Sequence, residues 1–310
     1  MSRERREHAA ESRGASAART PSQPTSATPA PDRIRVASWN LWWCFGDWRD
    51  RLPRILRELS ELNADVTGLQ ETWVVGEREQ AEELATQLGL YWAWVPSTRP
   101  ERWQERIPDP TDPARDALVG NAVLSRWPIL TTSSEVLPVG AGREEGRSVL
   151  GAEIDARGGV LPFFTTQLNS NPAHSATRVQ QATALARLVH GRTADAGDYP
   201  PVLCGDFNAM PDSDEMRLLE GHLTAGPVPD RVLVNAWRYY PGPPPPTWDP
   251  RNPYVAATFE PPATIDHMFV GPPRTDGRGR VVRVARFASD PSGGDGWASD
   301  HAGVVVDLGA

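Results

Sequence analysis

The stretch PPVLCGDFNAMPDS, residues 200–213, is a short apolar run that ends in carboxylate and amide side chains. The run 202–204 is apolar enough for a buried strand, and Asp206 and Asn208 follow where that strand would end. Proline before the run, and Gly, Asn and Pro after it, are typical of segments where the chain turns. The stretch therefore predicts a buried strand that carries polar groups to one edge of a sheet, followed by a short helix capped near Asp212.

Apolar runs of strand length recur on both sides of this stretch, and helical segments separate several of them. Leu and Ile at spacings of three and four give residues 52–62 a single apolar stripe, which is typical of a helix packed on a sheet. Strand-like runs in the middle of the chain are divided by Pro, Gly and charged turns, which favours antiparallel neighbours. These segments predict a layered α/β fold. Strands are expected over 33–43, 64–72, 118–129, 148–155, 160–168, 200–208, 263–270, 280–288 and 302–308, and helices over 52–62, 77–89 and 173–190.

The chain divides into a tail and one folded part. Residues 1–32 mix Arg, Ser, Ala and Pro without an apolar segment, so we expect a disordered tail there. Residues 33–310 show neither an internal repeat nor a second core after a linker, so we expect one domain. With 39% hydrophobic residues in 310, the chain can bury a core of its own, and a monomer is expected.

Net charge and cysteine use narrow the classes of function. The net charge of −8 disfavours indiscriminate binding to long nucleic acid, although it leaves room for a local basic groove. No apolar run is long enough to cross a bilayer. Cys44 and Cys204 stand in apolar sequence, as expected for reduced thiols. We therefore expect a cytoplasmic protein without a membrane span.

Polar side chains stand at the ends of most of the predicted strands. Strand ends of like sense meet at one edge of a sheet, so these groups can converge although they are far apart in sequence. Isolated carboxylates beside apolar strands are costly unless they are paired, hydrogen-bonded or metal-bound. Taken singly, each residue is also explained by a turn or a helix cap, whereas the set favours a shared site. Its members are Asn40, Glu71, Gln167, Asp206, Asn208, Asp266, Asp300 and His301.

Six short motifs in order resemble those of the endonuclease/exonuclease/phosphatase superfamily, which has the deoxyribonuclease I-like fold. They are SWN (38–40), LQET (69–72), GNAVLS (120–125), LCGDFNAMPDS (203–213), ATIDHMFV (263–270) and SDH (299–301). The resemblance covers residues 34–308. It implies a four-layer α/β sandwich, in which two mixed β-sheets pack face to face and helices cover the outer faces. It also implies a metal-dependent hydrolase of phosphoric esters.

The resemblance implies a metal site as well. Glu71 matches the metal carboxylate of the family, and Asn40 matches the amide that positions the metal and the phosphate. Asp300 matches a residue near that metal or near a second one. Mg²⁺ is the expected ion, with Mn²⁺ as the alternative, because Mg²⁺ needs few protein oxygens and completes its octahedron with water and substrate.

The resemblance further implies a general base. His301 matches that base, and Asp266 matches the carboxylate that orients its ring. An ordinary histidine pKa of about 6.5 suits proton transfer near neutrality. Asp206 and Asn208 match the pair that orients the attacking water and binds the phosphate.

The alternation of side chains along a strand predicts the directions in which His301 and His267 point relative to the aspartate before each of them. Adjacent residues on an extended chain point to opposite faces. Asp300 and His301 are therefore expected to point apart. His267, which follows Asp266, is expected to be a structural histidine on the other face.

Gln167 departs from the pattern of the family, which frequently carries a histidine at this position. A glutamine amide donates a hydrogen bond to a phosphate oxygen but delivers no proton near neutral pH. Gln167 is therefore expected to bind phosphate, and protonation of a leaving group falls to another group. An ordinary strand residue is the alternative.

Several further positions leave two readings open. Asn121 resembles a substrate-side residue, or it belongs to a turn. Arg143 and Arg147 precede a strand, where they meet a phosphate or form a solvated turn. The segment TWDPRNPY, residues 247–254, is either a lid over the site or a plain surface loop.

These observations predict a phosphodiesterase or nuclease-type enzyme. In the expected mechanism the water attacks phosphorus directly, since no nucleophilic Ser or Cys motif accompanies the site. The acidic charge disfavours a nonspecific duplex nuclease, and the lack of an apolar anchor disfavours a secreted, membrane-working sphingomyelinase. The expected substrate is a short nucleic acid or a small phosphodiester. A phospholipid or inositol-phosphate phosphoesterase is one alternative, and a catalytically weakened protein that binds a phosphate ligand is another.

Overall fold

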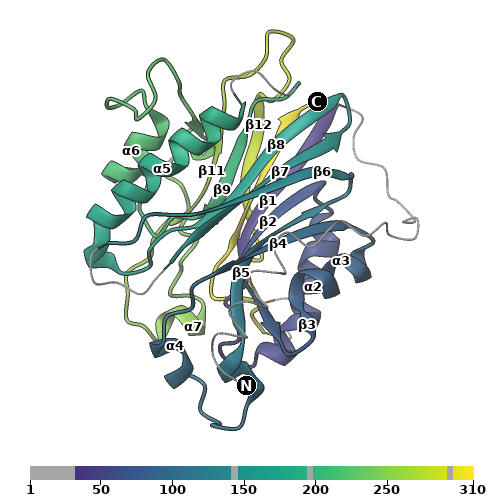
Figure 1. Cartoon of the computed structure of the whole chain (residues 1–310), viewed down its shortest axis with the longest axis vertical. Helices are drawn as coiled ribbons and strands as arrows, with labels where there is room; N and C mark the ends of the chain where they lie inside the picture. Colours follow the sequence, from purple (N-terminus) through teal and green to yellow (C-terminus); the bar gives the residue numbers. More distant parts are fainter. Residues whose placement is uncertain (1–31, 141–145, 194–197, 292–295) are drawn as a thin grey trace.

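The computed structural model describes residues 32–140, 146–193, 198–291 and 296–310. The predicted tail, apart from Asp32, and Arg143 lie outside the described residues. Two mixed sheets pack face to face, and the main helices flank them (Figure 1). The predicted four-layer α/β sandwich is confirmed.

The first sheet has seven strands and brings together both ends of the described chain. Its order is β12-β13-β1-β2-β5-β4, and β3 pairs with β2. Only β1 and β2 run parallel, and all other neighbours are antiparallel. The strands are β1 (Arg33–Asn40), β2 (Val66–Val75), β3 (Arg78–Glu79), β4 (Tyr91–Ser97), β5 (Leu118–Ser125), β12 (Val281–Phe287) and β13 (Gly303–Gly309).

The second sheet has six strands in the order β10-β11-β9-β8-β7-β6. Here only β8 and β9 run parallel. Each sheet therefore holds one parallel pair among antiparallel neighbours. The strands are β6 (Ile129–Val136), β7 (Ser148–Ala156), β8 (Gly159–Gln167), β9 (Val202–Asp206), β10 (Val234–Asn235) and β11 (Asp266–Val270).

Apolar side chains form three layers of core, one between the sheets and one beneath each pair of outer helices. The central layer includes Val66, Leu150 and Phe163, which are all fully or almost fully buried. Helices α2 (Trp48–Leu62) and α3 (Gln80–Leu88) cover the first sheet, and α5 (Ser175–Thr193) and α6 (Asp214–Glu220) cover the second (Figure 1). The short helices α4 (Arg102–Glu105) and α7 (Pro253–Ala256), with 3-10 turns at Pro113–Asp116, Pro172–His174 and Ala236–Tyr239, occupy connecting segments.

The structure contains strands that were not predicted, and one helix starts later than predicted. The additional strands are β3, β4, β6 and β10; β6 is an edge strand whose Thr and Ser side chains are largely exposed, so it lacks an apolar signal. Helix α3 begins at Gln80, because residues 78–79 pair with β2. The N-cap of α6 is Ser213, next to Asp212, and its hydroxyl accepts from Met216 N–H.

Candidate active site

The parallel pair of each sheet supplies two polar side chains at its carboxyl end. In the first sheet Asn40 lies opposite Gln70, next to Glu71, and in the second Gln167 lies opposite Asp206. The carboxyl ends of both pairs therefore reach one edge of the sandwich. The close fit there requires glycine, because a Cβ on Gly205 would lie only 2.0 Å from the carbonyl oxygen of Thr166.

The histidine and its carboxylate arrive at the same edge from strands that run the other way. Asp266 opens β11 and lies opposite Asp206 in antiparallel register. His301 precedes β13, which is antiparallel to β1. The site therefore collects residues at the ends of parallel strands and residues at the beginnings of strands that run antiparallel to them. The prediction treated all of these residues as strand ends of like sense and did not distinguish the two groups.

A break in strand β2 turns Glu71 into the site. The β2–β5 register shifts between Leu69 and Thr72, and Glu71 has a φ of 53°, in the left-handed region that non-glycine residues rarely adopt. Gln70 is free to point between the sheets, where its amide donates to Ser38 and Thr165 hydroxyls. Two adjacent polar residues thus serve different regions of the molecule.

Two amides connect the carboxylates of the two sheets. Asn40 Nδ2 donates to Glu71 Oε1 at 3.2 Å and to Asp206 Oδ2 at 3.0 Å. Gln167 Nε2 donates to the same two oxygens at 2.6 Å and 3.1 Å. The predicted residues Asn40, Glu71, Gln167 and Asp206 therefore form one buried polar cluster.

Arg147 determines which way the Gln167 amide points. Its Nη1 donates to Gln167 Oε1, and only 1% of Arg147 is exposed. Because an arginine only donates and a carboxylate only accepts, the amide must direct its NH₂ toward Glu71 and Asp206. The solvated-turn interpretation of Arg147 is therefore wrong, since the side chain is buried behind the site.

His301 and Asp266 form a fixed pair. Nδ1 of His301 lies 2.8 Å from Asp266 Oδ2, so Nδ1 carries a proton and donates it to Asp266, while Nε2 points away from Asp266. Tryptophan indoles hold both main chains: Trp39 Nε1 donates to the carbonyl of His301 and Trp237 Nε1 to that of Asp266. The ring of Trp248 also packs edge-on against His301, at 4.9 Å between centroids.

Asp300 and His301 share the site. His301 Nε2 lies 4.0 Å from Asp300 Oδ1 and also 4.0 Å from Asp206 Oδ2. The expectation that the adjacent side chains point apart is wrong, because Asp300 precedes strand β13 and the alternation of an extended chain does not apply there. The carbonyl of the preceding residue, Ser299, accepts from Asn252 Nδ2, and its hydroxyl donates to the carbonyl of Asn40 at 2.7 Å.

The buried carboxylates perturb one another. Burial raises the pKa of Asp300 to about 7, although His301 opposes the rise. Burial also raises the pKa of Asp206. For His301, burial works to lower the pKa, but Asp266, Asp300 and Asp206 together raise it well above 6.5. The edge of the sandwich thus concentrates negative charge that calls for a cation.

The donor set fits a hard divalent cation. Glu71, Asp206 and Asp300 offer carboxylate oxygens, which Mg²⁺ and Mn²⁺ prefer. Ligand atoms of Asp206, Asp266 and His301 also lie within 4.8 Å of one another. The 2.8 Å contact between His301 and Asp266 is a direct hydrogen bond, however, and Asp266 is fully buried. Asp266 is therefore engaged with His301, and the carboxylates that face the cleft are the groups that could hold a cation.

His267 is a structural histidine, as its position on the strand predicted. It is fully buried; Nε2 lies 2.8 Å from the carbonyl of Ala209, and Nδ1 lies 3.0 Å from Asn235 Nδ2. These partners require a neutral ring with its proton on Nε2. Burial lowers the pKa of His267 to about 4.

Neutral His267 should make the fold sensitive to acid. Its pKa of about 4 in the native state lies below the ordinary value of about 6.5, so the unfolded chain binds the proton first as the pH falls. His267 should therefore lower the free energy of unfolding as the pH falls, by about 2 kcal/mol at pH 5, while the raised pKa values of Asp300 and His301 act in the opposite direction. Urea unfolding of wild type and His267→Gln at pH 7.5 and pH 5 isolates the His267 contribution, since the variant should become more stable relative to wild type as the pH falls. A difference between the two proteins that is the same at both pH values would contradict the assignment.

The polar cluster opens into a cleft of about 260 Å³. Glu71, Gln167, Asp206, Asn208, Asp300 and His301 line it, together with rings and arginines that the sequence did not assign: Trp42, Phe45, Arg102, Trp103, Arg106, Trp248 and Tyr254. Trp248 and Tyr254 come from the segment 247–254, so that segment forms a wall of the cleft. Asn208 Nδ2 donates to the carbonyl of Leu168, and its N–H donates to Asp206 Oδ1.

Asn121 lies away from the cluster. Its Nδ2 donates to the carbonyl of Ser148 at 2.8 Å, which joins β5 of one sheet to β7 of the other. Asn121 is not one of the described residues that line the cleft. Its predicted role at the substrate stays a prediction, while its structural role is clear.

Arg51 ties the loops around the cleft together. Its guanidinium donates to five main-chain carbonyls, those of Leu41, Trp42, Trp43, Phe45 and Ala298, at 2.8–3.1 Å. Only 1% of the residue is exposed. Burial lowers its pKa to about 10, although Asp300 opposes the fall, so the side chain is cationic at neutral pH. Sequence reasoning missed Arg51 because it stands inside an amphipathic helix, where a charged residue is usually solvated.

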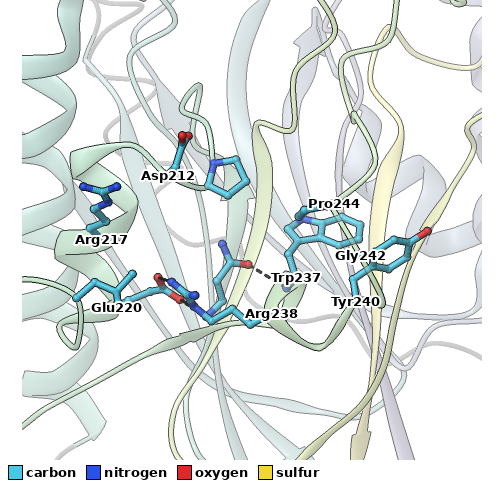
Figure 2. A pocket seen from close by; sticks show the side chains of 11 residues that line it. Asp212, Arg217, Glu220, Trp237, Arg238, Tyr240, Gly242 and Pro244 are labelled. Atoms are coloured by element: carbon cyan, nitrogen blue, oxygen red, sulfur yellow. Dashed lines mark hydrogen bonds and ion pairs between the residues drawn. The ribbon is translucent and has the colours of Figure 1, made fainter.

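A second cavity, of about 360 Å³, lies between α6 and residues 235–244 (Figure 2). Glu220 is almost fully buried in its wall and pairs with Arg238 through both carboxylate oxygens. Figure 2 shows Trp237 and Tyr240 beyond Arg238, on the side away from Glu220. Among the described residues, no predicted site residue lines this cavity. Trp237, which lines this cavity, contacts the active site, because its indole donates to the main-chain carbonyl of Asp266.

Comparison with known proteins agrees with this geometry. The sequence model of the Endonuclease/Exonuclease/phosphatase family matches residues 37–301, whereas no curated protein matches the sequence. Among solved structures the chain is similar to D. rerio TDP2 complexed with single strand DNA product, with 18% identity, a TM-score of 0.66, and coverage of 90% of this chain and 99% of that one. The chain is also similar to the human Nocturnin catalytic domain with bound sulfate anion, with 19% identity, a TM-score of 0.62, and coverage of 89% of this chain and 93% of that one. An endonuclease/exonuclease/phosphatase from Beutenbergia cavernae gives 23% identity, a TM-score of 0.63, and coverage of 90% of this chain and 72% of that one.

At these identities the structural likenesses show the fold, and they define its class as the deoxyribonuclease I-like sandwich. The family match extends over most of the chain and adds the activity class. The chain belongs to the endonuclease/exonuclease/phosphatase family and is a phosphoesterase. Enzymes of this family typically use a divalent metal. Cys44 and Cys204 are both free and buried, and no helix of the described residues is long and apolar enough to cross a membrane.

Proposed function

We propose that this phosphoesterase hydrolyses phosphodiesters by direct attack of a water molecule on phosphorus. The observation that carries the proposal is the position of His301: Nδ1 is bonded to buried Asp266, and Nε2 faces the cleft 4.0 Å from Asp206 Oδ2. One water can hydrogen-bond to both Nε2 and Asp206. His301 accepts the proton of that water when its ring is neutral, a form that a cation bound to the neighbouring carboxylates would favour by opposing their effect on its pKa, and Asp266 stabilises the imidazolium that results.

The remaining polar groups bind the phosphate and a cation. Glu71, with Asn40 and Asp300, would hold Mg²⁺ or Mn²⁺, which when bound supplies positive charge to the phosphoryl oxygens. Gln167 directs its NH₂ into the site because Arg147 holds its carbonyl, and Asn208 lines the same cleft. Asn208 has one amide hydrogen beyond its bond to Leu168 and can donate it to a phosphate oxygen, and Gln167 can do so in exchange for one of its bonds to Glu71 or Asp206. Two structural relatives hold a single-stranded DNA product and a sulfate anion, which supports a phosphate-ester substrate.

Hydrolysis should require the cation. Wild-type protein should hydrolyse bis-(p-nitrophenyl) phosphate and a fluorescent single-stranded oligonucleotide in Mg²⁺ or Mn²⁺, and EDTA should abolish turnover of both. The same cation should raise the Tm at pH 8, since a ligand that binds only the native state stabilises it. Glu71→Gln should lose both effects. Glu83→Gln, which removes only an exposed partner of Arg78, should keep them.

Two outcomes would count against this function. Turnover that persists in EDTA at the wild-type rate would exclude the role given to Glu71. A cation-dependent rise in Tm without turnover of either substrate would favour the alternative of a phosphate-binding protein.

A further inference from the structure

The cleft is chemically divided. One part consists of the carboxylates, amides and His301 described above. The other part consists of aromatic rings with Arg102 and Arg106, contributed by the loop after β1, by α4 and by α7. Helices α4 and α7 lie close together at one end of the molecule (Figure 1) and line this same cleft. A phosphate alone makes no use of the aromatic part.

Tyr254 ends a stack of planar groups. The guanidinium of Arg51 lies 4.8 Å from the centroid of the Trp42 ring, and the Tyr254 ring lies 4.4 Å from the same ring at an interplanar angle of 34°. Among the described residues Tyr254 has no ring contact other than Trp42, and it is half-buried in the cleft wall. Tyr254 therefore offers a ring face on which a flat substrate group can stack.

The stack is fixed next to the phosphate site. Trp42 N–H donates to Asn40 Oδ1 at 2.9 Å, and the amide nitrogen of the same Asn40 donates to Asp206 and Glu71. Trp42 has a φ of 60°, an uncommon conformation for a tryptophan, held by this bond and by Arg51. Trp42 therefore connects Tyr254 with Asn40 of the polar cluster, and Tyr254 lines the same cleft as Glu71 and Asp206.

Positive charge lies beside the rings. The guanidinium of Arg106 is 3.7 Å from the centroid of Phe45, and within the described part of the chain it forms no ion pair with a carboxylate. Arg102 stands one helical turn before it on α4. In a chain of net charge −8, Arg106 is suited to a second anionic group of the substrate, even though Glu260 also lines the cleft.

We propose that the cleft binds a single-stranded nucleotide substrate, in which an unpaired base stacks on Tyr254 and a neighbouring phosphate meets Arg106. The inference rests on the proposed phosphodiester hydrolysis and names its substrate class. An inositol phosphate lacks a planar ring to stack on Tyr254. A choline headgroup can place its quaternary ammonium on aromatic rings, but the guanidinium of Arg106 beside the rings of this cleft disfavours a cation there. A paired base is stacked within its own duplex and does not present a free face to Tyr254.

Binding of two matched ligands tests the proposal without turnover. Thymidine 3′,5′-bisphosphate and 1,2-dideoxyribose 3′,5′-bisphosphate differ only in the base. In Mg²⁺, with recovery of intact ligand confirmed, equilibrium dialysis should give the thymidine ligand at least about a 10-fold lower Kd, the ordinary effect of stacking one base. Tyr254→Leu should remove the difference and Tyr254→Phe should restore it. Tyr239→Leu, an exposed tyrosine outside the cleft, should leave it unchanged.

Equal affinity for the two ligands, or a preference that survives Tyr254→Leu, would overturn the proposal. So would binding of glycerophosphocholine as tightly as the thymidine ligand, which would point to a lipid headgroup instead. Cation-dependent hydrolysis of a base-free diester without any preference for the base would defeat this inference alone. Base-selective binding without hydrolysis would defeat only the proposed function.

Discussion

Replacement of His301 by glutamine should lower kcat/KM for a phosphodiester by about 10²–10⁴-fold, the usual contribution of a general base. A glutamine in this place can still hydrogen-bond to Asp266, but it accepts no proton at the position of Nε2. The effect should fall on kcat, because His301 acts on the attacking water and contributes little to substrate affinity. Steady-state kinetics on bis-(p-nitrophenyl) phosphate and on a single-stranded oligonucleotide measure it.

The chain provides a matched control for this variant in its other fully buried histidine. His267→Gln removes an imidazole one residue from Asp266, but His267 contacts Ala209 and Asn235 and not the cleft. It should keep kcat/KM within a few-fold of wild type at neutral pH. If the two variants lose activity equally, the role assigned to His301 reduces to support of the fold, and the mechanism proposed above is wrong.

Replacement of Arg51 by methionine should lower the free energy of unfolding by about 3–5 kcal/mol, the range for removal of one partner from a buried charged network. Methionine fills much of the volume but leaves five main-chain carbonyls without their donor. It also removes one of the positive charges that oppose the rise in the pKa of Asp300. Urea unfolding followed by tryptophan fluorescence measures the loss.

The effect of Arg51→Met should extend to activity in the molecules that remain folded. Arg51 holds the main chain of Trp42, and Trp42 N–H holds Asn40 in the polar cluster. Arg54→Met is the matched control, because Arg54 lies one turn along the same helix and, within the described part of the chain, makes one weak hydrogen bond, at 3.5 Å, to the carbonyl of Trp297. A loss below 1 kcal/mol for Arg51→Met, or an equal loss for both variants, would contradict this role.

Much of the fold was predictable because its strands are buried and its helices amphipathic. Strand β2 is buried along its whole length and β9 likewise, so their apolar runs stand out in the sequence. The motifs around Glu71, Asp206 and His301 predicted the family correctly, and the structure places these three residues in one cleft. Edge strand β6 could not be predicted, since its exposed polar side chains carry no periodic apolar signal.

The parts of the site that escaped prediction depend on long-range contacts. Arg51 and Arg147 are charged residues in segments that look solvated, and their burial follows only from what the fold packs against them. The bulge that turns Glu71 into the site is a backbone conformation with no glycine to mark it. Asp300 shares the cleft with His301 because the chain is not yet extended there, and strand alternation has no meaning before a strand begins.

The bonds of Asn40 and Gln167 have a consequence for how the enzyme becomes active. Asn40 and Glu71 come from one sheet, and Gln167 and Asp206 come from the other. Each of the two amides donates to both carboxylates, Glu71 and Asp206, and so joins the two sheets. Neither sheet alone contains a working site, so catalysis begins only when the two sheets have packed against each other in their final register. The rate at which activity returns during refolding therefore reports on the packing of the two sheets. Activity should return later than the secondary structure of each sheet.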